Sequence, residues 1–384
     1  MTAAATLNQL SQIQSLLLAL VEANDDDASR RQYHADLSPL GWHLGHCVYT
    51  ETYWVQEVIQ GDASRSAPYQ TLFTPELTPR PQRGPLLPPR EQLLDWAATQ
   101  LSDNLMRLAN LAPPQASHAL LADDYLPWFL LQHHAQHYET MLMVLTQRAL
   151  QGSYPSYRAR TPLVAASGAG VIRTVPAGHY RIGGVAPLAF DNELPPQHAE
   201  LGEFRIAVQP VSNAQYLAFM QAGAYADARL WSASGWTWCQ QHGASRPEHW
   251  CCDADGAYFG VGVNGPYELA ADAPLHGINH YEATAFANWA GARLPHEYQW
   301  EAAYRSGLLA ETGRAWEWCE NSFHPYEGFK PFPYERYSAP WFDGAHLTLR
   351  GGSLHTRPVL QRASFRNFYT ADKRHVFAGL RLLF

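Results

Sequence analysis

The sequence predicts two domains, an N-terminal bundle of four helices followed by a loop-rich α+β domain. Apolar residues recur at helical spacing through the first part of the chain, whereas short β-type segments and many turns follow a stretch rich in Gly, Ser, Pro and Ala. The 384 residues, 46% hydrophobic and 16% charged, suffice for two separate cores. We place the helical domain at residues 1–151, a linker at 152–170 and the second domain at 171–384.

The first two predicted helices are defined by an apolar face and by a starting signal. The apolar face of the first consists of Leu7, Leu10, Ile13, Leu17 and Val21. The second begins at Ser38, with Pro39 in its first turn, because these residue types suit the N-cap and N1 positions. It continues through Trp42 and His46 to Tyr53.

A proline-rich segment from Thr74 to Pro89 joins the second and third helices, and its six prolines predict a connection without regular structure. The third helix carries Leu93, Leu101 and Leu108 on its apolar face. The fourth runs from about Pro127 to Ala149. An antiparallel bundle with the proline-rich link as a crossover is the simplest arrangement.

The second domain is predicted to contain short strands and two clear helices. Residues 171–175 are of β type. One helix opens at Ser212, with Gln215 three residues later, and the other opens at Asn279 with Glu282, so the first matches the pattern of a capping box and the second resembles it. Irregular segments fill the rest and are expected to carry the binding surface.

Charge and composition exclude several classes of partner. The net charge of −8 and the absence of a Lys/Arg run argue against nucleic acid. No stretch approaches the about 18 continuous apolar residues of a membrane helix, and the N-terminus lacks signal-peptide features. Five cysteines without a CxxC pair indicate reduced thiols. We expect a soluble, cytoplasmic protein with small-molecule partners and no membrane association.

His133 and His137 form a candidate metal site, because residues four apart on a helix project from one face. A third ligand must come from another helix, and the second offers His43 and His46. His46 is preferred because Gly45 beside it permits close helix approach. Three protein ligands leave coordination positions open, as catalysis at a metal requires.

Other polar residues of the bundle have less specific interpretations. Gln136 and Glu139 offer an amide and a carboxylate that orient ligands or substrate. His43 and His134 are interpreted as ordinary polar or capping residues. An HxxxH pair is common without a metal, and its spacing differs from the HExxH signature of zinc proteases.

Motifs along nearly the whole chain resemble those of the ergothioneine-type sulfoxide synthases and the related selenoneine synthases. The helical part contains HxxxHxE at His133, His137 and Glu139, and a segment SPxxWxLxH that ends at His46. The second domain contributes Pro210–Phe219, Gly291–Arg305, Trp316–Phe323, Arg350–Ser353 and Phe365–Leu382. The resemblance implies a DinB-like bundle joined to a C-type-lectin-like domain of the kind found in formylglycine-generating enzymes.

The resemblance also implies a reaction and its ligands. The three histidines His46, His133 and His137 would bind iron(II), with O2 as co-substrate, and a sulfur or selenium donor would be joined to imidazole C2 of hercynine, the Nα-trimethylated histidine. Gln136 and Asn367 match hercynine contacts of the family. The faces of Phe368 and Tyr369 are candidates for holding the trimethylammonium group, because aromatic rings attract cations.

The donor site departs from the best-known members of that family. Synthases that use γ-glutamylcysteine have a tryptophan, an aspartate and an arginine where this chain has Phe368, Tyr369 and Lys373. Loss of the carboxylate and of the bidentate guanidinium weakens recognition of a zwitterionic peptide. We therefore favour a selenosugar donor, with cysteine or γ-glutamylcysteine as the alternative. Arg83 and Arg90 lie in a family region that contacts the donor.

Tyr334 or Tyr337 would supply the proton that a tyrosine donates in this family, a reasonable role for a phenol. Three rival functions stay open. The first is a zinc-dependent thiol transferase, because related bundles activate thiolates with three histidines. The second is formylglycine generation, which lacks support because no cysteine follows Cys319. The third is a non-catalytic lectin-like binding module.

Overall fold

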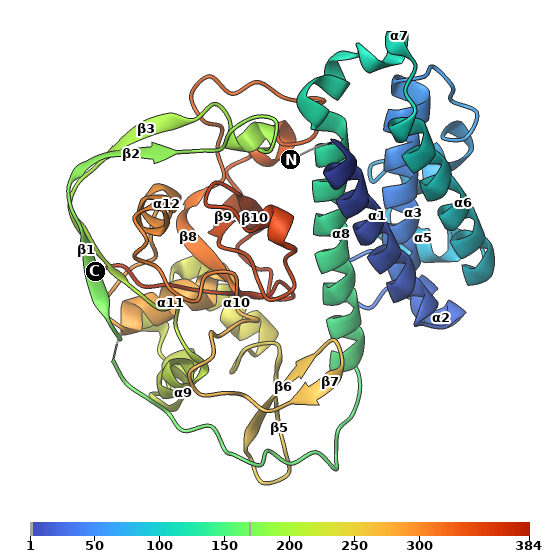
Figure 1. Cartoon of the computed structure of the whole chain (residues 1–384). Helices are drawn as coiled ribbons and strands as arrows, with labels where there is room; N and C mark the ends of the chain where they lie inside the picture. Colours follow the sequence, from blue (N-terminus) through green and yellow to red (C-terminus); the bar gives the residue numbers. More distant parts are fainter. Residues whose placement is uncertain (1–2, 169) are drawn as a thin grey trace. The chain divides into compact units, whose positions relative to one another are not determined.

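The structure is a computed structural model that describes residues 3–168 and 170–384. Met1, Thr2 and Ala169, the last of which falls in the expected linker, lie outside the described residues. The chain divides into two compact units, Met1–Arg148 and Ala149–Phe384, and each is described by itself (Figure 1). The predicted fold class, a helical N-terminal part followed by an α+β part, is confirmed.

The first unit is helical, and among its described residues the longest helices lie side by side (Figure 1). They are α1 (Ala3–Glu22), α3 (Leu40–Thr52), α6 (Arg90–Ala109) and α8 (Tyr125–Leu150). Shorter helices connect them: α2 (Asp26–Arg30), η1 (Tyr53–Val58), η2 (Ala67–Tyr69), α4 (Gln70–Phe73), α5 (Arg80–Leu86), α7 (Pro113–Ala116) and η3 (Ala119–Asp124). Helix α3 packs against both α1 and α6.

The core of this unit follows the predicted apolar faces. Leu10, Leu17 and Val21 of α1 are fully buried, as are Leu44 and Val48 of α3. Each such side chain contributes about 1.5–3 kcal/mol by leaving water, so the packed faces stabilise the bundle more than helix propensity does.

The prediction that Thr74 to Pro89 lacks regular structure is wrong, because α5 lies within it. Pro81 stands in the first turn, where its missing N–H is not needed, and Pro85 stands inside this short helix. Gly84 permits close packing, since a Cβ there would clash with the carbonyl oxygen of Arg30. Tertiary packing therefore stabilises a helix that proline content alone disfavours.

The predicted start of the second helix is shifted by one residue. Pro39 is the N-cap of α3, and Ser38 does not cap it. The Ser38 hydroxyl instead accepts a hydrogen bond of 2.5 Å from Nη1 of Arg83, which lies in α5 within the proline-rich link. A long-range partner has replaced the local bond that the sequence suggests.

The described residues of the second unit form four small sheets. Their strands are β1 (Ile172–Val175), β2 (Gly178–Ile182), β3 (Gln197–Leu201), β4 (Phe204–Ala207), β5 (Trp250–Cys252), β6 (Tyr258–Gly262), β7 (Gly265–Tyr267), β8 (Trp316–Ser322), β9 (His346–Arg350), β10 (Asn367–Thr370) and β11 (Ala378–Gly379). Antiparallel pairs join β1 to β4 and β2 to β3, and β5, β6 and β7 form an antiparallel sheet. The largest sheet has the order β10, β9, β8, β11, with β8 and β11 parallel.

Helices of the second unit are more numerous than predicted. The α-helices are α9 (Asn213–Gln221), α10 (Ala233–His242), α11 (His280–Trp289) and α12 (Glu297–Arg305), and the short 3-10 helices are η4 (Asp191–Glu193), η5 (Ala224–Ala226), η6 (Ala228–Leu230), η7 (Ala339–Trp341) and η8 (Pro358–Leu360). The capping boxes at Ser212 and Asn279 are confirmed at the starts of α9 and α11. The prediction missed α10 and α12, although Ser232 caps α10 and Gly243 ends it in the left-handed conformation that favours glycine.

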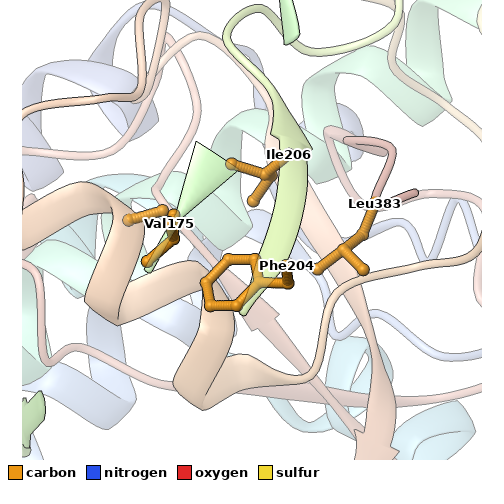
Figure 2. Close-up of a cluster of buried hydrophobic side chains, with 5 residues drawn as sticks. Val175, Phe204, Ile206 and Leu383 are labelled. Atoms are coloured by element: carbon orange, nitrogen blue, oxygen red, sulfur yellow. The ribbon is translucent and has the colours of Figure 1, made fainter. Parts of the chain in front are cut away.

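A hydrophobic cluster ties the start of the second unit to its end (Figure 2). Val175 of β1, Phe204 and Ile206 of β4, Ala303 of α12 and Leu383 are all buried in it. Leu383 also pairs through its backbone with Ile206. The C-terminal residues thus fill the core of the unit.

Buried ion pairs brace the same unit. Both carboxylate oxygens of Glu297 accept hydrogen bonds from Arg366, at 2.7 and 2.8 Å, and Arg350 lies 3.0 Å away. Burial alone would raise the pKa of Glu297, but the guanidiniums of Arg366 and Arg350 lower it to about 2. Glu297 is therefore charged at neutral pH. Removing one partner of such a buried ion pair would leave the other charge unpaired and destabilise the unit.

Candidate metal centre

Three imidazoles from two helices converge inside the first unit. His46 comes from α3, and His133 and His137 come from successive turns of α8. One ring nitrogen from each of the three lies within 4.8 Å of the other two. The Nε2 atoms of His46 and His133 are 3.2 Å apart.

These distances fit a single transition-metal ion. With metal–nitrogen bonds of about 2.1 Å, two ligand nitrogens are about 3.0 Å apart at a right angle and about 3.4 Å apart at the tetrahedral angle. The observed 3.2 Å between His46 and His133 falls between these values. The donor set, three imidazoles, is typical of sites for zinc, iron, copper or nickel.

The three rings are held in the neutral form that a metal requires. Burial lowers the pKa of His46 to about 4 and lowers the pKa values of His133 and His137 well below the ordinary value. Neutral imidazoles keep a lone pair for a cation. The convergence of three neutral imidazoles at this spacing therefore supports the metal prediction.

Each of the three imidazoles contacts a different partner through Nδ1. His46 Nδ1 lies 2.7 Å from the carbonyl oxygen of Phe73. His137 Nδ1 lies 3.0 Å from Nδ1 of His43, and His133 Nδ1 lies 3.3 Å from Nδ1 of His134. The interpretation of His43 and His134 as ordinary polar or capping residues is therefore wrong, because both are buried beside the candidate ligands.

A buried carboxylate stands behind His134. Nε2 of His134 lies 3.0 Å from Oε2 of Glu51, and the amide of Gln14 donates to both oxygens of Glu51 at 2.8 and 3.0 Å. Glu51 and His134 are fully buried, and Gln14 is 3% exposed. No local sequence motif indicated this series of hydrogen bonds, since Gln14, Glu51 and His134 come from three different helices.

Local packing explains why His46 points inward. A Cβ on Gly45 would overlap the ring of Phe73, so glycine makes room for the residue whose carbonyl contacts His46. Trp42 stacks on the His46 ring, with centroids 4.9 Å apart and an interplanar angle of 10°. Above Trp42 lies the guanidinium of Arg83, 4.0 Å from the ring centroid.

A second group of potential ligands overlaps this site and is less suitable. Cys47, His133 and His134 also bring ligand atoms within 4.8 Å of one another. Burial raises the pKa of the Cys47 thiol well above the ordinary value, and Glu51 already bonds His134. A thiol that stays protonated is a poor ligand, so the three-histidine group is the better candidate.

The other predicted residues of the bundle lie near the histidines in the chain. Gln136 is partly buried on α8, and Glu139 is 4% exposed two residues after His137. Their predicted roles as substrate contact and orienting carboxylate stay predictions.

The two arginines predicted to contact the donor have structural partners. Arg83 is buried and donates to the carbonyls of Thr78 and Pro75 as well as to Ser38. Arg90 is partly buried and donates to the carbonyl of Glu22. Both arginines therefore stabilise the link and its neighbours, and donor binding by either stays a prediction.

The predicted substrate residues of the second unit gather on β10 and the turn after it. Asn367 opens β10, and Phe368 stacks on Phe323 with ring centroids 4.3 Å apart. Tyr369 follows on the same strand. Lys373 lies 3.0 Å from the carboxylate of its neighbour Asp372.

The two tyrosines predicted as proton donors lie near one another. The rings of Tyr334 and Tyr337 have centroids 6.0 Å apart. Tyr334 is 42% exposed, whereas Tyr337 is partly buried against Phe190. Their burial differs, so a test of the two side by side is informative.

Among residues 3–168 and 170–384, no helix is sufficiently long and apolar to cross a membrane.

Fold and site together define a class of two-domain proteins, in which a bundle with three convergent histidines precedes a small-sheet α+β domain. Residues 9–141 match the DinB superfamily, and residues 165–312 and 306–384 match the family described as sulfatase-modifying factor enzyme 1-like domain. The chain belongs to the family that joins these two domains and that includes the hercynine oxygenases.

Three relatives illustrate this membership. A hercynine oxygenase of Mycolicibacterium thermoresistibile is 32% identical, over 97% of this chain and 93% of the relative. A hercynine oxygenase of Mycolicibacterium smegmatis is 31% identical, over 98% and 97% respectively. Ergothioneine biosynthesis protein 1 of Schizosaccharomyces pombe is 26% identical, over 51% of this chain and 27% of that protein.

Proposed function

We propose that this chain is a mononuclear non-heme iron(II) enzyme that uses O2 to join a chalcogen donor to imidazole C2 of hercynine. The observation that carries the proposal is the convergence of His46, His133 and His137, whose facing nitrogens have the spacing of ligands to one ion. Two relatives aligned over more than nine-tenths of their length are named hercynine oxygenase, which supports the acceptor.

The reaction balances with O2 as the oxidant. Hercynine loses the hydrogen on C2, the donor loses the hydrogen on sulfur or selenium, and a carbon–chalcogen bond forms. One oxygen atom goes to the chalcogen as an oxide, and the other leaves as water. The bound iron would supply the redox chemistry that lets O2 react with closed-shell substrates, at positions that three protein ligands leave open.

The chain's own residues would bind and orient the reactants. We assign the Gln136 amide and Asn367 to hydrogen bonds with hercynine, and the faces of Phe368 and Tyr369 to its trimethylammonium group, since a quaternary ammonium attracts aromatic rings. Glu139 would orient groups around the ligands. A phenol, Tyr334 or Tyr337, would donate the proton that accompanies reduction of oxygen.

For the donor we propose a selenosugar. The ammonium of Lys373 is paired with Asp372 at 3.0 Å, which reduces its capacity to hold a carboxylate of a zwitterionic peptide. Tyr369 offers an aromatic platform and a hydroxyl partner for a sugar. A thiol such as cysteine or γ-glutamylcysteine is the second candidate, because a relative is named ergothioneine biosynthesis protein 1.

A competition assay tests acceptor and donor together. Protein purified without oxygen is loaded with iron(II) and incubated with hercynine, O2, a selenosugar and a thiol, and the products are identified by mass spectrometry. We expect an adduct at C2 of hercynine that contains selenium and that is lost in His137→Ala. A sulfur adduct alone would refute the selenosugar, and turnover without O2 would favour a zinc thiol transferase. Ligand binding without turnover would favour a lectin-like module.

A further inference from the structure

The residues behind the candidate metal ligands form a path of hydrogen bonds from α3 and α1 to one ligand. His133 Nδ1 contacts His134, His134 contacts Glu51, and Gln14 donates to both oxygens of Glu51. All four side chains are at most 8% exposed. This path is additional to the three ligands and to the substrate residues of the proposed function.

The protons along this path can be placed without conflict. If His133 carries its proton on Nδ1, it donates to Nδ1 of His134, which then carries its own proton on Nε2. That proton is donated to the acceptor Glu51, 3.0 Å away. In this arrangement Nε2 of His133 has a free lone pair, and that atom is the one that lies 3.2 Å from Nε2 of His46.

The same reasoning applies to the other two ligands. His46 donates from Nδ1 to the Phe73 carbonyl, because a carbonyl oxygen only accepts. His137 has its Nδ1 beside Nδ1 of His43. Thus each candidate ligand is oriented through Nδ1, and its Nε2 would be the atom left to hold an ion.

His43 and His134, the histidines that contact His137 and His133, differ in whether their own Nε2 atom has a hydrogen-bond partner. A His43 that accepts from His137 must carry its proton on Nε2, and this atom is buried without a hydrogen-bond partner among the described residues. His134, in contrast, has a carboxylate for its proton. The Glu51 path is therefore the firmer of the two, since an incompletely satisfied polar network is weak.

We propose that Glu51 and His134 are positioning residues that fix His133 in the tautomer that binds the metal through Nε2 and supply the site with a buried negative charge. A divalent ion held only by neutral imidazoles would have no charge compensation among its ligands, and Glu51 would provide it through two intervening rings, His134 and His133. Partners of this kind raise ligand basicity and metal affinity. This inference rests on the metal site of the proposed function.

Cobalt(II) bound to the full-length apoprotein tests the assignment in two ways. First, the unchanged protein should give three solvent-exchangeable, cobalt-shifted proton NMR signals, one from each Nδ1–H. Second, E51Q, which keeps the shape and removes the charge, should bind cobalt about 10- to 100-fold more weakly in chelator competition. The control is N104A, because Asn104 is equally buried and bonds Thr52 and Gln56 of the same bundle without contacting the histidines.

The expected result is weaker binding in E51Q and unchanged affinity in N104A. Fewer than three exchangeable signals, or equal cobalt affinity of E51Q and the unchanged protein, would overturn the proposal. The NMR count needs no variant, so the test stands even if E51Q does not fold. Unchanged protein that binds cobalt but never modifies hercynine would refute only the proposed function, whereas protein that binds no cobalt would refute both.

Discussion

Replacing Gly45 by alanine should destabilise the bundle and weaken the metal site, although alanine is the better helix former. In the interior of a helix, the exchange favours folding by about 1 kcal/mol. Against this, a Cβ on Gly45 overlaps two carbons of the Phe73 ring and lies 3.0 Å from a third. Overpacking of this kind costs about 1–3 kcal/mol. Displacement of Phe73 also weakens its carbonyl's bond to His46, worth about 1 kcal/mol.

These opposing effects leave a net loss of about 1–3 kcal/mol in the free energy of unfolding. For a unit of this size the melting temperature falls by about 2–4 °C for each kcal/mol, measured by circular dichroism at the helical band. Gly202→Ala is the control, because nothing lies within 4 Å of its added Cβ. A Gly45→Ala protein that melts higher and binds cobalt as tightly as before would refute the steric reasoning.

Three further predictions concern charge, the proton donor and the metal. The pKa of Glu297 is about 2, below its ordinary value, despite burial and because of Arg366 and Arg350. The pairing therefore contributes about 3 kcal/mol to the free energy of unfolding. This contribution is complete above the ordinary pKa of 4.5 and is lost as the pH falls toward 2. Thermal melts of Glu297→Gln across this pH range should lack this part of the pH dependence. Only one of the variants Tyr334→Phe and Tyr337→Phe should slow product formation in single-turnover assays, while both keep their cobalt affinity. If neither variant is slower, neither tyrosine is the proton donor. Removal of the metal by a chelator should lower the melting temperature of the helical unit. The free energy of unfolding should fall by about 4 kcal/mol if the free metal concentration was 1,000 times the Kd. An unchanged melting temperature would contradict a tight site.

Sequence periodicity predicted the helices that contribute an extended apolar face to the bundle. It could not predict α5, since contact between Gly84 and Arg30 stabilises this proline-containing helix across the chain. The missed helices α10 and α12 are as long as α11 and α9, but neither opens with the residue pattern that identified those two. Gly235 stands three residues after the N-cap Ser232 of α10, and the N-cap of α12 is His296, a residue type that is not a usual N-cap. Local signals are reliable where the bond is local, as in the capping boxes of α9 and α11.

The candidate ligands were predictable for a similar reason. Spacing on one helix groups His133 and His137, and the structure brings a nitrogen of His46, which Gly45 favoured over His43, within 4.8 Å of a nitrogen of each. The role of the three as metal ligands stays a prediction. The supporting residues were not predictable, because a glutamate far away in the chain has no sequence mark that assigns it to a histidine. Pairing of this kind depends on how the helices pack.

Helix α3 supplies side chains that support both candidate ligands of α8. His43 of α3 lies against His137 of α8, while Glu51 of α3 holds the ring that contacts His133. Sliding either helix by a single turn would separate His43 from His137 and Glu51 from His134 at once. The histidine site therefore depends on the register of α3 against α8. A design that transfers the site to another protein would have to include both helices in this register.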